Sequence, residues 1–203
     1  MVVFLRKAAF VSGFLLAGSL LAGCAGNDLG KPPKPIGDFR LGFNIVVADN
    51  AETAGPTRTA TPDEWEAVLK EEIARRIGRY DGEKLYHIGV GVNAYALAVP
   101  GVPLVLSPKS VLVISVDVWD DAVQRTVNAE TKKLTIFESA SGKTLVGSGL
   151  TKTREQQMRS LSENAAAAIE KWLAENKAWF TPEAVAARAA MPASAAAAPP
   201  AAN

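Results

Sequence analysis

The chain has 203 residues, of which 48% are hydrophobic and 21% are charged, and it contains one His and one Cys. Its 22 Lys and Arg residues nearly balance its 21 Asp and Glu residues, so it lacks the basic excess of a nucleic-acid-binding protein. A single cysteine excludes an internal disulfide and a cysteine zinc site. We expect no cofactor, no bound metal and no nucleic-acid partner.

The first 24 residues carry the most specific pattern in the chain. Arg6 and Lys7 precede an apolar run over residues 8–22. This run is shorter than the roughly 20 residues that a membrane-spanning helix needs, and its length is typical of a signal peptide. It ends in the tetrapeptide Leu21-Ala22-Gly23-Cys24. The leader therefore resembles the signal peptide and lipobox of bacterial lipoproteins.

The resemblance implies that residues 1–23 are removed and that Cys24 becomes the first mature residue, with a diacylglyceryl group on its sulfur. Two or three acyl chains anchor a protein stably, because each buried CH₂ contributes about 0.8 kcal/mol. In Gram-negative lipoproteins an Asp after the cysteine favours the inner membrane, and Ala25 stands there in this chain. The resemblance thus implies an outer-membrane anchor with the domain facing the periplasm, and the inner membrane is the alternative.

Composition divides the mature chain into three parts. Residues 24–37 are rich in Gly and Pro, which predicts a semi-rigid tether between membrane and domain. Residues 38–180 predict a single domain of sufficient size for one buried core. Residues 181–203 are rich in Ala and Pro and predict a disordered tail, with a short helix from Pro182 as a local alternative.

The first half of the domain predicts a strand followed by a helix. Residues 39–48 include a β-branched run typical of a strand. Thr61 and Glu64 have the spacing of a capping box, and apolar residues recur behind them at helical spacing up to Tyr80. Arg75, Arg76 and Arg79, near the end of this helix, complement its dipole.

The second half predicts four strands and a closing helix. Apolar and polar residues alternate over 86–98 and 111–119, a third strand begins at residue 134, and a hairpin at 139–143 leads into a fourth over 144–151. Thr153 and Gln156 form another capping box before an apolar stripe. The order β-α-β-β-β-β-α predicts an α+β fold, with an antiparallel or mixed sheet of about five strands and both helices on one face.

Catalytic patterns are weak. His87 is the only histidine and lies inside a predicted strand, so a paired or surface histidine explains it more simply than a general base does. Asp117 and Asp120 lie at the end of another strand. A hydrolase built on His87 with either carboxylate is the least favoured of our hypotheses, and we expect no enzyme.

The connection over residues 100–108, between the predicted strands 86–98 and 111–119, is unexpectedly apolar for a loop. It either folds over the sheet or is exposed for a partner. The candidate partner-contact residues are Val102, Leu104, Val105 and Leu106.

The predicted layout resembles that of small, mostly uncharacterised envelope lipoproteins, and its order is similar to that of the lipopolysaccharide-assembly lipoprotein family. We therefore expect a non-enzymatic binding protein or accessory subunit of an envelope assembly or transport machine, with an envelope protein as partner. The alternative is a lipid- or glycan-binding module with a pocket between helices and sheet. Tyr86, Tyr95 and Trp119 are the residues expected to line such a pocket. The sequence predicts no oligomeric state.

Overall fold

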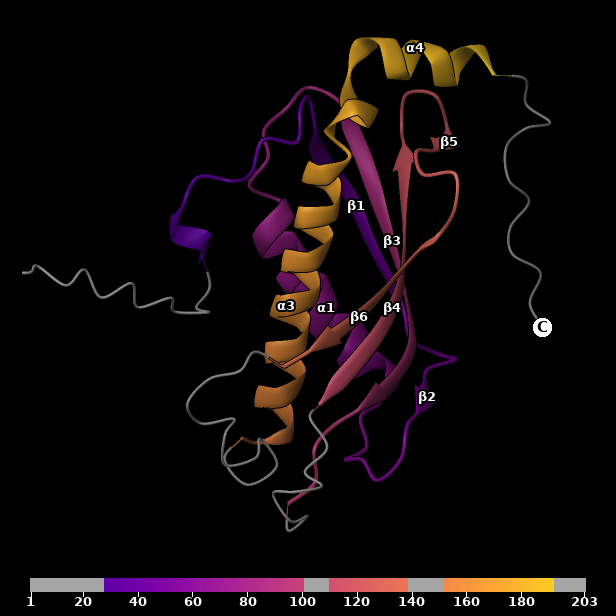
Figure 1. The fold of residues 1–203 in the computed structure, drawn as a ribbon. Coiled ribbons are helices and arrows are strands. Elements are labelled where there is room, and N and C mark those ends of the chain that lie inside the picture. The colour runs from indigo at the N-terminus through magenta and orange to yellow at the C-terminus, as the bar shows by residue number, and fades with distance from the viewer. Residues whose placement is uncertain (1–27, 101–109, 139–151, 192–203) are drawn as a thin grey trace, which may run out of the picture.

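A computed structural model describes residues 28–100, 110–138 and 152–191. It confirms the α+β class, with a mixed sheet of six strands (Figure 1). The elements in chain order are η1 (Asp28–Gly30), β1 (Arg40–Val47), β2 (Glu52–Thr53), α1 (Pro62–Ile77), β3 (Leu85–Ala96), β4 (Val111–Asp120), β5 (Arg125–Thr126), β6 (Lys132–Phe137), α3 (Arg154–Glu175), η4 (Lys177–Phe180) and α4 (Pro182–Ala190).

The sheet is mixed because α1 connects its first two long strands. A helical crossover returns the chain in the same direction, and β1 accordingly pairs parallel with β3, followed by the short β2 on the same side. β4 pairs antiparallel with β3 and with β5 and β6 on its other side. Within the described sheet, β1 is an edge strand.

Both long helices begin at the predicted capping boxes. The Thr61 side chain accepts from the Glu64 backbone N–H, and the Glu64 carboxylate accepts from the Thr61 N–H at 2.8 Å. Thr153 and Gln156 repeat this exchange at the start of α3. These bonds satisfy backbone donors that have no partner within the helix.

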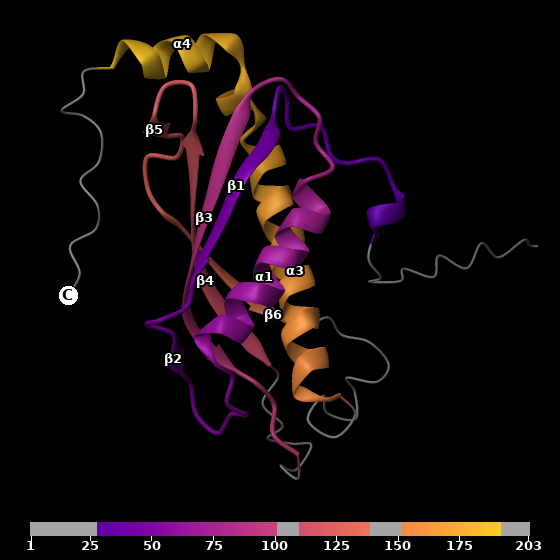
Figure 2. The same cartoon turned by 180° about the vertical axis from the view of Figure 1, so that it is seen from behind.

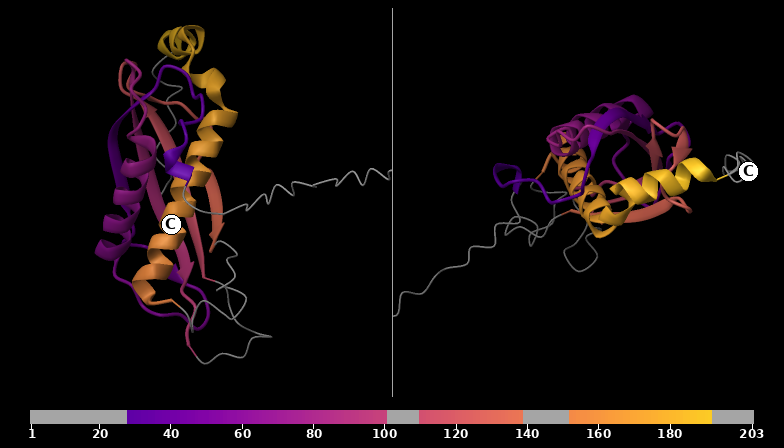
Figure 3. Two further views of the ribbon diagram at one scale, coloured as in Figure 1. Left: turned by 90° about the vertical axis from the view of Figure 1, so that its left-hand side faces the viewer. Right: turned by 90° about the horizontal axis from the view of Figure 1, so that it is seen from above.

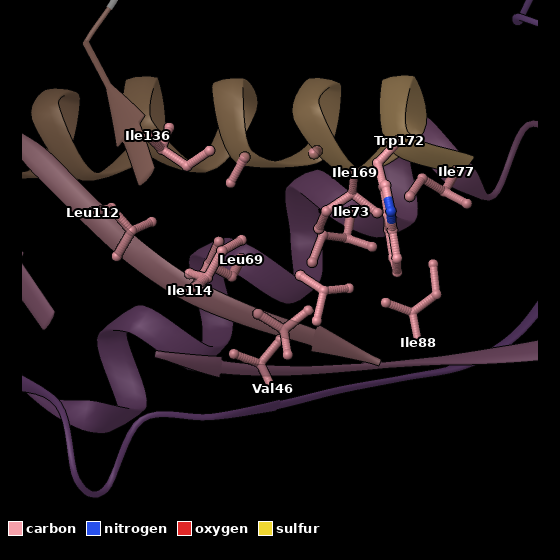
Figure 4. Close-up of a cluster of buried hydrophobic side chains, with 14 of the residues drawn as sticks. Val46, Leu69, Ile73, Ile77, Ile88, Leu112, Ile114, Ile136, Ile169 and Trp172 are labelled. Atoms are coloured by element: carbon pink, nitrogen blue, oxygen red, sulfur yellow. The ribbon is translucent and has the colours of Figure 1, made fainter. Parts of the chain in front are cut away.

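The core lies between the two helices and one face of the sheet. α1 and α3 lie side by side on that face (Figures 1 and 2). Burial alternates along β3 and β4, so that every second side chain points toward the helices. The apolar side chains that meet there include Val46, Leu69, Ile73, Ile77, Ile88, Leu112, Ile114, Ile136, Ile169 and Trp172 (Figure 4).

The described part of the predicted tether packs against the domain. Ile36 is only 1% exposed and belongs to the core, next to the buried Phe39. The semi-rigid tether expected up to residue 37 therefore does not include residues 28–37, which pack on the domain. Composition suggested a spacer, but one apolar side chain and several hydrogen bonds suffice to dock the segment.

The C-terminal end of the domain also extends beyond the expected boundary at residue 180. α4 begins at the predicted Pro182, and Arg188 in it donates to the buried Asp120 carboxylate at 2.6 Å. Phe180 is buried against Phe39 and Tyr86. Residues up to Ala190 therefore belong to the domain and not to a tail.

None of the helices that the structure describes is long and apolar enough to cross a membrane.

Candidate binding face on the sheet

Five of the predicted site residues lie outside the part of the chain that the structure describes. Cys24 and the loop residues Val102, Leu104, Val105 and Leu106 lie outside the described part of the chain, as does the predicted strand over 144–151. The lipidation site and the loop contact therefore stay predictions.

His87 has a structural role in the described fold. Its Nδ1 accepts a hydrogen bond from the Phe43 backbone N–H at 2.8 Å, and its Nε2 lies 3.0 Å from Asp121 Oδ1. Because Nδ1 is an acceptor, the neutral ring carries its proton on Nε2 and donates it to Asp121. Both ring nitrogens are thus engaged in joining β1 and the turn after β4 to β3.

The carboxylates of the hydrolase hypothesis are engaged elsewhere. Asp117 accepts hydrogen bonds from Asn128 at 2.8 Å and from Thr131 at 3.1 Å. Asp120 is buried and paired with Arg188. Neither forms the pair with His87 that the hypothesis requires. Among the described residues, no three His, Cys, Asp or Glu side chains converge on a point that could hold a metal ion.

The three aromatic residues expected to line one pocket do not meet: Tyr86 and Tyr95 are both in the core, and the sheet separates them from Trp119. Tyr86 is buried and stacks on Phe39 with ring centres 5.3 Å apart. Tyr95 packs on Trp65, and its hydroxyl bonds the Ala60 backbone. Trp119 lies opposite His87, on the face away from the helices. These side chains therefore do not form a common ligand pocket.

The sheet face that points away from α1 and α3, here called the open face, carries large apolar side chains. Phe43, Ile45 and Val47 on β1 are 69%, 55% and 47% exposed. We call these three residues the apolar stripe. Trp119 and Phe137 are also exposed on β4 and β6. No helix or strand among the described residues covers this face (Figures 1 and 2), and clustered exposed apolar side chains are typical of an interaction site.

Two glycines of β3, Gly89 and Gly91, lie beside the apolar stripe. We call them the glycine track. In the pairing of β1 with β3, Ile45 lies beside Gly89 and Val47 beside Gly91. A Cβ placed on Gly89 would meet only the Asp117 carbonyl oxygen, and one on Gly91 only the Ser115 Cβ, each at 4.0 Å. Neither glycine is therefore required by packing or by a positive φ, and together they leave the flank of the stripe open.

The sequence itself contains an indication of this exposed apolar face. The strand 39–48 has apolar residues at consecutive positions, a pattern that is typical of a strand buried on both faces. Within the run Ile45-Val46-Val47, Val46 points into the core, while Ile45 and Val47 point outward. The face is indicated by two features together: the apolar run in β1 and the Gly-x-Gly pattern in the neighbouring strand β3.

A concave site lies between the first turns of α1 and α3. It has a volume of about 300 Å³ and an apolar floor, and ion pairs flank it. The Arg154 guanidinium, hydrogen-bonded to Glu64, lowers the pKa of that carboxyl. The lining residues are Glu64, Ala67, Val68, Glu71, Arg154, Glu155, Met158 and Arg159.

No family model matches the chain, and no curated protein matches its sequence. A solved structure from Xanthomonas campestris is 13% identical with a TM-score of 0.40, covering 73% of this chain and 94% of its own. A predicted lipoprotein of Caulobacter crescentus is 18% identical, with a TM-score of 0.36 and coverage of 66% and 94%. A minor lipoprotein of Acinetobacter baumannii is 16% identical, with a TM-score of 0.29 and the same coverage. Two of these three proteins are described as lipoproteins.

Proposed function

We propose that the protein is a membrane-anchored envelope lipoprotein without enzymatic activity, and that it binds a partner protein through the apolar stripe of β1, at one edge of the open face. The observation that carries this proposal is the exposure of the apolar stripe on an edge strand. Proteins usually protect long apolar edge strands because they pair with other chains. An accessible one is a ready site for an extended segment of a partner, which can add a strand and bury the stripe.

Site-specific crosslinking in intact cells tests the proposed interface. A photoreactive residue at Phe43 should yield a covalent adduct of one defined mass. The same residue at Thr135, which is exposed on the open face of β6, serves as the control and should yield much less. Equal labelling from both positions, or none from Phe43, would contradict the proposed interface.

A purified partner then allows a direct binding test. Ile45→Lys should weaken binding at least tenfold, because it places a charge where apolar surface is buried. A tenfold loss of affinity corresponds to about 1.4 kcal/mol of binding free energy. Thr135→Lys adds the same charge outside the stripe and should leave the affinity unchanged. Both positions are exposed, so both variants should unfold at the wild-type temperature.

The lipid anchor has its own test. Cys24→Ser should abolish incorporation of radiolabelled palmitate and leave the precursor uncleaved. Continued labelling of the variant would refute the anchor. The apolar loop remains a second proposed contact, and Leu104→Asp tests it in the same binding assay.

Lipid binding is the second candidate function, and the site between α1 and α3 is the observation that favours it. Its volume of about 300 Å³ is at the lower end of small-molecule sites, and Val68 and Met158 offer an apolar floor. Val68→Trp should fill this space and abolish retention of a radiolabelled fatty acid. Retention unchanged by this variant would argue against lipid binding at the site.

A further inference from the structure

The segment that follows the proposed lipidation site is held by a buried network of charges. Glu170 of α3 is 1% exposed, and its carboxylate accepts from Arg76 at 2.9 Å, from Arg79 at 3.1 Å and from Tyr80 at 3.0 Å. We call these four residues the Glu170 network. Such a network is costly to bury unless its hydrogen bonds are made, and here the carboxylate accepts three.

The same arginines hold the N-terminal segment on the helices. Arg76 pairs with Asp28 at 2.8 Å, and Arg79 donates to the backbone carbonyls of Leu29 and Lys31, each at 3.0 Å. Leu29 lies next to side chains of both α1 and α3. Together with the buried Ile36, these contacts fix residues 28–36 to the helical layer.

This attachment limits the distance between anchor and domain. Three residues separate Cys24 from Asp28, and the four steps along the chain from Cys24 to Asp28 span at most about 14 Å when fully extended. If the chain were free up to Ile36, the corresponding reach would be roughly 40 Å. The point of attachment is η1, which lies on the helical side of the molecule, across from the open face (Figure 3).

We propose that the Glu170 network and the lipid on Cys24 together hold the helical layer against the bilayer, so that the apolar stripe points away from the membrane. This orientation rests on the proposed lipid anchor. Lys31 and Lys34 are exposed on the attached segment, where their amines can meet lipid phosphates. The membrane contact is polar, since none of the large exposed hydrophobic side chains among the described residues lies on α1 or α3.

Fluorescence quenching on vesicles tests the orientation. The full lipidated protein is reconstituted in phosphatidylethanolamine and phosphatidylglycerol vesicles that contain a headgroup-linked quencher. One label replaces Glu163 of α3, which lies near Leu29 of η1. The other label replaces Thr135 on the open face. The label at 163 should be quenched more strongly than the label at 135.

Two variants supply the controls. A Gly/Ser insertion of 12 residues after Asn27 leaves every described contact intact and should abolish the difference between the two labels. Arg79→Ala should reduce it by releasing the segment. Protein that floats with the vesicles but shows equal quenching at both labels, or stronger quenching at 135, would overturn the orientation alone. Protein that does not float would overturn the lipid anchor, and the orientation with it.

Discussion

Ile45 on β1 lies directly beside Gly89 on β3, and the missing side chain of Gly89 leaves the flank of Ile45 open to a partner. The relationship repeats one step along the strands, between Val47 and Gly91. Glycine weakens the interior of a strand because it loses more backbone freedom on folding than other residues do. Glycine at both positions is therefore better explained by the shape of the surface than by the stability of the fold.

We predict that Gly89→Ala and Gly91→Ala weaken partner binding but do not destabilise the fold. Each variant should raise the free energy of unfolding by up to about 1 kcal/mol, because alanine loses less backbone entropy and has room for its Cβ. Urea denaturation measures the first effect, and a binding titration measures the second.

Gly82 provides the contrasting control for these two substitutions. A Cβ at Gly82 would lie 2.4 Å from the Phe39 backbone nitrogen and 2.7 Å from its carbonyl oxygen. Gly82→Ala should therefore destabilise the fold clearly. If Gly89→Ala were equally destabilising, the glycine track would have a packing role and the argument from surface shape would fail.

The buried ion pair between Arg188 and Asp120 makes a second prediction. Arg188→Ala should lower the free energy of unfolding by about 3 kcal/mol, since it leaves a carboxylate without its charged partner in the protein interior. Lys171→Ala is the matched control, because it removes an exposed pair with Glu175 at 3.7 Å and should cost at most about 0.5 kcal/mol. Equal effects would mean that α4 is not part of the cooperative domain.

The elements of this fold could be predicted because their signals are local. Thr61 with Glu64 and Thr153 with Gln156 begin their helices as expected, and the alternation along β3 matches its buried and exposed sides. Capping boxes and hydrophobic periodicity depend on neighbours within a few residues. A single sequence can therefore indicate the layers of the domain.

The sites could not be predicted, because their partners are distant in the chain. The position of Arg76 near the end of a helix predicts an interaction with the helix dipole, yet its side chain pairs with Glu170, 94 residues away. Ile36 stands in a Pro-rich stretch, and only the assembled core explains its burial. The exposure of Ile45 likewise depends on the helices covering only one face of the sheet and on β1 being its edge strand, which are properties of the assembled fold and not of the strand itself.

The attachment of the N-terminal segment should depend on pH. The hydrogen bond from Arg76 lowers the pKa of Asp28, helped by the charge of Lys34, although partial burial opposes the shift. The unfolded value for Asp is about 3.9. Because the folded pKa lies lower, the ion pair stabilises the attached segment above the unfolded value, and this contribution is lost as the pH falls through the folded pKa.

Hydrogen exchange at residues 28–36 between pH 6 and pH 3, corrected for the intrinsic pH dependence of exchange, measures this effect. In the wild type, protection of this segment should decline toward pH 3. Asp28→Asn lacks the titrating carboxylate, so its protection should be lower at pH 6 and should change less with pH. Glu170 in the same network also carries a carboxyl group, and the difference between wild type and variant isolates the part due to Asp28. Identical profiles for the two proteins would show that Asp28 does not hold the segment, leaving Arg79 and Ile36 as its attachment.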